Sequence, residues 1–136
     1  MDNVAYDVVE GVLVLVQRRD LDGDELGELL STSSRKGAKR VLVWVEAGSI
    51  GSKERKKIAE ALSDGRIRKV SVLTDERLAR GAATAVSWFG VPIRAFATDE
   101  REPALDALGL EGPARDRVSS TLDALRRSGA SQSGTG

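Results

Sequence analysis

Three short apolar runs, separated by segments with helical periodicity, constrain the fold more than any other feature of this sequence. The runs are Arg40–Val45, Val70–Thr74 and Pro92–Phe96. Strands that are buried on both faces read as continuous apolar runs, because helices cover both sides of a parallel sheet. The segment from Lys39 to Phe96 therefore predicts an α/β fold in which three parallel strands alternate with two helices.

Two further apolar stretches precede this unit. Val4, Tyr6 and Val8 alternate with less apolar residues, Val12–Val16 forms a continuous run, and Glu10-Gly11 separates the two stretches. Because Glu-Gly suits a tight turn, we predict an antiparallel hairpin. One bent strand with a glycine bulge is the alternative.

Helices are predicted where apolar residues recur at helical spacing behind a capping residue. The expected ranges are 22–34, 53–64, 76–89, 100–108 and 113–127. Thr98 and Asp99 are expected to cap the fourth of these helices. The chain is then expected to form one domain over 1–110, a C-terminal helix over 111–127 and a disordered Ser/Gly-rich tail over 128–136.

The composition excludes several functional classes. The chain has 136 residues, no cysteine, no histidine, and 21 basic against 21 acidic side chains. Without these two residue types, disulfides, thiol catalysis and a Ser-His-Asp triad are impossible, and a zinc enzyme is not expected. We therefore expect neither a cofactor nor a metal site. The balanced charge gives no field that would attract nucleic acid or an anionic membrane.

The N-terminus carries no targeting signal that we can identify. Met1-Asp2-Asn3 is acidic and precedes no long apolar run, and no stretch is long enough to span a bilayer. The expected location is the cytoplasm.

The turn that follows the run Arg40–Val45 is a candidate functional site. It contains Gly48, Ser49, Gly51 and Ser52, and it opens the helix predicted over 53–64. Free backbone N–H groups at such a position can hold a phosphate. The turn lacks the Gly-Lys-Ser/Thr ending of a P-loop and the three-glycine dinucleotide spacing. We therefore favour a simple turn in which Ser49 or Ser52 caps the helix.

Two other features each have a structural and a functional interpretation. Lys53, Arg55 and Lys56 make one helix face basic, which is a surface for an acidic partner or nucleic acid or, as we favour, a solvated face. Trp44 and Trp88 are expected to anchor the core, and a partly exposed tryptophan that marks a pocket or a partner surface is the alternative.

The order of these elements resembles that of STAS domains, and most closely the SpoIIAA-like, or STAS/SEC14, group of small bacterial proteins. The resembling stretches are Arg40–Val45 before a glycine-containing turn, Arg68–Asp75, and Val91–Glu100 before an alanine/leucine helix. The resemblance covers roughly Val4 to Leu110. It implies a mixed sheet in the order ββαβαβαβα with an N-terminal antiparallel hairpin, followed by the C-terminal helix.

The resemblance also implies a function. It suggests a non-enzymatic regulatory or scaffolding module that acts through protein–protein contact, with a regulatory kinase or a similar protein as partner. In antagonist members a serine in an Asp-Ser-Ser-Gly-like turn before the second helix is a phosphorylation switch. Ser49 is the residue that would carry this role here, with Ser52 second, although no Asp precedes the serine and there is no Ser-Ser pair.

Other functions stay open at this point. A binding module for a small apolar or lipid-like ligand is the alternative, and an enzyme ranks third because the usual catalytic groups are missing. The oligomeric state is also open, with a homodimer as one arrangement.

Overall fold

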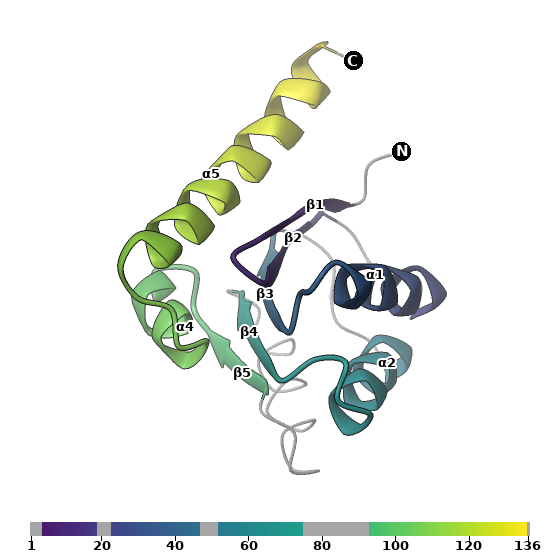
Figure 1. The fold of residues 1–136 in the computed structure, drawn as a ribbon. Helices are drawn as coiled ribbons and strands as arrows, with labels where there is room; N and C mark the ends of the chain where they lie inside the picture. Colours follow the sequence, from purple (N-terminus) through teal and green to yellow (C-terminus); the bar gives the residue numbers. More distant parts are fainter. Residues whose placement is uncertain (1–3, 19–22, 47–51, 75–92, 136) are drawn as a thin grey trace.

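The computed structural model describes residues 4–18, 23–46, 52–74 and 93–135 (Figure 1). Its strands form one five-stranded sheet in the order β1-β2-β3-β4-β5. The strand bounds are β1 (Val4–Val9), β2 (Val12–Gln17), β3 (Arg40–Val45), β4 (Lys69–Leu73) and β5 (Ile93–Phe96). β1 pairs with β2 in antiparallel fashion and the other neighbours are parallel, which confirms the predicted mixed sheet.

The turn between β1 and β2 is a two-residue hairpin turn. Val9 pairs with Val12, and Glu10 and Gly11 both have positive φ, at 53° and 72°. Positive φ at both central residues defines the type I′ turn, whose twist matches that of the flanking strands. The hairpin, rather than the bent strand, is therefore the correct alternative. Arg40 steadies the turn, because its Nη2 donates a hydrogen bond of 2.9 Å to the Glu10 carbonyl oxygen.

Helices cover both faces of the sheet (Figure 1). The helices are α1 (Gly23–Arg35), α2 (Ser52–Ser63), α4 (Arg101–Ala107) and α5 (Gly112–Thr135). α1 and α2 pack side by side on one face, and α4 and α5 lie on the other, with α4 over β4 and β5 and α5 over β1 and β2. The helix predicted over 76–89 lies outside the described residues.

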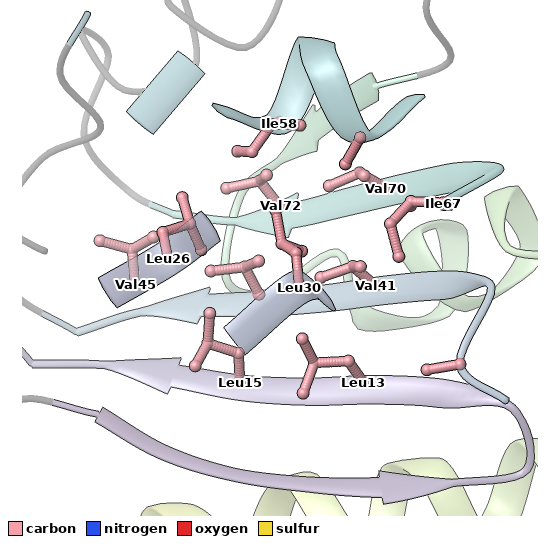
Figure 2. Packing of buried hydrophobic residues seen from close by; sticks show 13 residues of the cluster. Leu13, Leu15, Leu26, Leu30, Val41, Val45, Ile58, Ile67, Val70 and Val72 are labelled. Atoms are coloured by element: carbon pink, nitrogen blue, oxygen red, sulfur yellow. The ribbon is translucent and has the colours of Figure 1, made fainter. Parts of the chain in front are cut away.

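The layer between the sheet and helices α1 and α2 is filled by aliphatic side chains. β2 contributes Leu13 and Leu15, and α1 contributes Leu26 and Leu30. In Figure 2 the labelled side chains of this layer are Leu13, Leu15, Leu26, Leu30, Val41, Val45, Ile58, Ile67, Val70 and Val72. Alternate residues of one strand point to opposite faces, so the intervening residues of the same strands form a second layer.

That second layer joins the sheet to α4 and α5. Val12, Val14 and Val16 of β2 are fully buried there, and so are Val118 and Leu122 of α5. β2 and β3 therefore contribute apolar side chains to both layers, whereas β4 buries Ser71 in the second layer, where its hydroxyl donates a hydrogen bond of 2.9 Å to the Ala104 carbonyl oxygen. Burial of β2 and β3 on both faces is the pattern that their continuous apolar runs predict.

Two helix ends differ from the expectation. α4 begins at Arg101, and its N-cap residue is Glu100, whose side chain makes no capping hydrogen bond, so the prediction that Asp99 caps this helix is wrong. The Glu100 carboxylate instead accepts a hydrogen bond of 2.7 Å from the N–H of Ala97. That contact closes the turn before the helix, and it leaves the N–H groups of the first turn of α4 without a cap from the Glu100 side chain.

α5 is longer than predicted. It continues past Arg127 to Thr135, through a segment whose composition predicts disorder. A helix that is already anchored extends at little cost, since each added residue gains one backbone hydrogen bond. The division into a domain over 1–110 and a separate C-terminal helix stays a prediction.

Candidate functional site

Charged side chains gather around Trp44 at the carboxyl ends of β2 and β3. In open α/β sheets this is the edge where ligands bind. Arg18 follows β2, Glu46 follows β3, Arg101 begins α4, and Arg126 lies on α5. We refer to these five residues as the strand-end cluster: Arg18, Trp44, Glu46, Arg101 and Arg126.

Trp44 is the centre of this cluster. Its side chain lies on the α4/α5 face of β3, because Val43 and Val45 occupy the opposite face. The residue is 8% exposed, which confirms that Trp44 anchors the core, whereas Trp88 lies outside the described residues. The guanidinium carbon of Arg126 is 3.9 Å from the centroid of the indole ring, and that of Arg101 is 5.8 Å away. Both lie within the range of cation–π attraction.

Arg18 and Arg126 share one carboxylate. The Arg18 Nε is 3.5 Å from one Glu46 oxygen, and the Arg126 Nε is 3.8 Å from the other. Both distances exceed those of a good N–H···O hydrogen bond. Arg18 Nη2 makes one short contact, a hydrogen bond of 2.8 Å to the Leu125 carbonyl oxygen. Among the described residues, Arg18 Nη1 and Arg126 Nε are buried donors without a hydrogen-bond partner.

Arg101, in contrast, is fully engaged. Its Nη2 lies 2.9 Å from an Asp123 carboxylate oxygen, and its Nη1 lies 3.1 Å from the Ser119 hydroxyl oxygen. The hydrogen bond from Arg101 lowers the pKa of Asp123, burial opposes this shift, and the charges of Arg101, Arg126 and Arg127 add to the lowering. The Arg101–Asp123 pair is thus a closed link between α4 and α5, set in a positive local field.

A second link between the same helices involves Arg115, in the first turns of α5. Its guanidinium group contacts the carboxylates of Glu102 and Asp106 on α4 and the Leu110 carbonyl oxygen. The hydrogen bonds that Arg115 donates to Asp106, and then those to Glu102, raise the pKa of Arg115. Because each of these donors has a partner, we assign Arg115 a structural role.

The residues that the sequence singled out are only partly described. Gly48, Ser49 and Gly51 lie outside the described residues, so their predicted roles stay predictions. Ser52 is the first residue of α2, one residue before the predicted start of that helix, and its predicted role as a cap stays a prediction. The backbones of Lys53 and Arg55 belong to α2, and their side chains lie outside the described part.

Lys56 is the predicted surface residue whose side chain is described. It is exposed on α2, whereas Ile58 and Ala61 of the same helix are buried against the sheet. This placement fits both a solvated face and a partner surface. It does not bring Lys56 together with the strand-end cluster, which lies on the opposite face of the sheet.

Sequence reasoning did not identify Arg18, Glu46, Arg101 or Arg126. One signal was present, since Glu46 is the first residue beyond a predicted strand and Arg18 lies two residues beyond the predicted run Val12–Val16. Parallel strands bring such positions to the same edge of a sheet. No comparable local signal exists for Arg101 and Arg126, because helices distant in sequence bring them to that edge.

A small cavity lies in the other layer, between the sheet and helices α1 and α2 (Figure 2). Its lining is apolar, and its volume is about 10 Å³, which is room for about one water molecule. The lining residues are Leu15, Leu26, Leu30, Val41, Val43, Ile58, Ala61, Ile67 and Val70. Sites for drug-sized ligands measure about 300–1,000 Å³. The cavity cannot hold a lipid chain unless the layer opens.

Metal-binding groups and membrane-spanning helices are both absent from residues 4–18, 23–46, 52–74 and 93–135. In these ranges no group of acidic side chains is arranged to hold a metal ion. No helix of the same ranges is both long enough and apolar enough to cross a membrane.

Comparison with known proteins gives a likeness of fold. No family model matches the chain, and no curated protein matches it. A solved structure from Shewanella loihica PV-4 does match, an uncharacterised protein of the DUF3478 family described as having a SpoIIAA-like fold. The match covers 76% of this chain and 92% of that chain, with 14% sequence identity and a TM-score of 0.52. At this identity the likeness carries the fold and not the function.

Proposed function

We propose that this chain, whose fold is SpoIIAA-like, is a non-enzymatic regulatory or scaffolding module that acts through protein–protein contact. One observation supports this most. Among the described residues, an apolar layer packs on each face of the sheet, and the cavity between the sheet and helices α1 and α2 measures only about 10 Å³. That cavity has no room for a substrate or other organic ligand, which favours recognition of the surface by another protein.

The surface that we assign to the partner is the start of α2 and the turn before it. It comprises Gly48, Ser49, Gly51, Ser52, Lys53, Arg55 and Lys56. Lys56 is exposed. The neighbouring Lys57 packs its side chain against Gly27 of α1, because a Cβ added at Gly27 would lie 3.3 Å from the Lys57 Cδ. The basic residues of this surface favour an acidic surface on the partner, which by family analogy is a regulatory kinase or a similar protein.

Phosphorylation would act at the same surface. A phosphate on Ser49, or second on Ser52, would add negative charge beside the N-terminus of α2, where the helix dipole favours it. The phosphate would change the charge of the surface that the partner contacts, and the fold would not need to change. Phosphosite mapping of the protein from its native cell tests this step, and an unmodified Ser49 and Ser52 under all growth conditions would contradict it.

Charge reversal on α2 tests the partner surface. Lys56→Glu is expected to weaken capture of the native partner, because it turns attraction toward an acidic surface into repulsion. Lys36→Glu is the matched control, since Lys36 is also exposed and lies beyond the end of α1. The measurement is capture from native cells, followed by titration with the purified partner. Equal affinities for the two variants would contradict the assigned surface.

The alternative is a binding module for a small apolar or lipid-like ligand. It would require the layer that contains the cavity to open, because the closed cavity is too small. Native mass spectrometry of the purified protein separates the two proposals, since a ligand that co-purifies would add a defined mass.

For the regulatory module we propose a cytoplasmic location. We propose no nucleic-acid partner, because the positive and negative charges of the chain balance.

A further inference from the structure

We propose that Arg18 and Arg126 form a binding site for a phosphate group at the carboxyl ends of β2 and β3. This inference is argued from the strand-end cluster alone and does not rest on the proposed partner surface. It starts from an unusual arrangement in which two guanidinium groups converge on a single carboxylate and neither forms a close pair with it.

Unused hydrogen-bond donors are the first argument. Arg18 Nη1 and Arg126 Nε are buried, and neither has a hydrogen-bond partner among the described residues. A buried donor without a partner costs about 1–3 kcal/mol, more when it belongs to a charged group. An oxyanion that bridges the two guanidinium groups would satisfy both donors, and the planar fork of arginine matches the spacing of phosphate oxygens.

Charge is the second argument. Arg18 and Arg126 carry two positive charges against the single negative charge of Glu46, and Asp123 is already engaged by Arg101. Arg127 adds positive charge to the same region, since its field reaches Asp123. A phosphate group carries a charge of about −1.5 to −2 at neutral pH. Such a group compensates the two arginines better than one carboxylate does.

Access is the third argument. The Glu46 side chain is 35% exposed, so it can turn into water when an anion takes its place. The Arg126 side chain is 38% exposed and reaches the surface, whereas the Arg18 side chain, at 18%, forms the floor of the site. Glu46 is thus a weak internal competitor for the position that the phosphate would occupy.

Preorganisation is the fourth argument. Arg126 is held over the ring of Trp44 at 3.9 Å, and Arg18 is held by its hydrogen bond of 2.8 Å to the Leu125 carbonyl oxygen. Both guanidinium groups are therefore oriented before a ligand arrives. Orienting them in advance lowers the entropy that binding would otherwise cost.

Titration with inorganic phosphate at constant ionic strength tests the site, with calorimetry as the readout. Saturable binding is expected for the native chain, and acetate is expected to bind more weakly. Arg126→Gln is expected to weaken phosphate binding about tenfold or more, which corresponds to the loss of one charged contact. Arg117→Gln is the matched control on the same helix, because Arg117 pairs with Glu10 at 2.8 Å and is remote from Trp44.

Glu46→Gln tests whether the Glu46 carboxylate competes with phosphate for the two arginines. If Glu46 competes with phosphate, this variant should bind phosphate more tightly than the native chain does. If Glu46 only supports the fold, the variant should bind equally or less well, and that result would overturn the proposal. This arm decides the question even if Arg126→Gln fails to fold, because the variant leaves both arginines in place.

Fluorescence locates the binding event. In a Trp88→Phe background Trp44 is the only tryptophan of the chain, and its emission should change with the same dissociation constant that calorimetry reports. O-phosphoserine is titrated in parallel, and tighter binding than inorganic phosphate would assign the source of the group to a modified side chain. No saturation with either compound, or equal binding of acetate, would overturn the assignment.

Discussion

At the scale of single residues, Asp123 links stability to pH. Its pKa is lowered mainly by the hydrogen bond from Arg101, so the folded state favours the ionised carboxyl group. The stabilisation is fully present above the unfolded pKa, near 3.8, and is lost as pH falls through the lower folded value. Asp123→Asn should therefore reduce the free energy of unfolding at pH 7, and the difference from the native chain should shrink at low pH. Urea unfolding at pH 7 and pH 3 measures this, and a difference independent of pH would contradict it. Because the side chain is 41% exposed, we expect the effect at pH 7 to be modest.

At the scale of elements, α5 is the helix whose removal is most informative. Deletion of residues 112–136 should leave a folded domain, because the other layer, with α1 and α2, does not involve α5. The domain should be less stable by several kcal/mol, since burial of one aliphatic side chain contributes about 1.5–3 kcal/mol and Val118 and Leu122 are both fully buried. It should also bind a hydrophobic dye on the exposed face of β2. Urea unfolding of the truncated chain tests this, and loss of a cooperative transition would show that α5 is required for the fold.

The strands could be predicted from the sequence, because the determining signal is local. An apolar run such as Val12–Val16 tells which segment is buried on both faces, and Glu10-Gly11 identifies the turn. The strand-end cluster could not be predicted in this way. The hydrogen bond from Arg18 to Leu125 joins residues 107 positions apart, and no periodicity relates them. Asp99 was misassigned for a different reason, because the two residues that follow a strand offer more than one place for a helix to begin, and α4 takes Glu100 as its N-cap residue.

At the scale of the whole molecule, the two apolar layers share one sheet and should unfold together. Ile67→Val, in the α1/α2 layer, should lower the free energy of unfolding by about 0.5–1.5 kcal/mol. Val118→Ala, in the α4/α5 layer, should lower it by about 1–3 kcal/mol. The double variant should unfold in one transition, and its free energy of unfolding should be lower by the sum of the two single effects. The effects should add because the two sites lie on opposite faces of the sheet. Far-ultraviolet circular dichroism and tryptophan fluorescence should give coincident curves. Two separate transitions would contradict this prediction.

The order of the strands has a consequence for synthesis on the ribosome. Each strand lies beside the one made just before it, so the sheet can grow in step with translation. The face of β1 and β2 is different, because α5, which covers it, is made after all five strands. The nascent chain therefore carries Val12, Val14 and Val16 without their cover until α5 emerges. Exposed apolar strands are prone to aggregate, so the interval before α5 emerges is one in which this sheet needs protection.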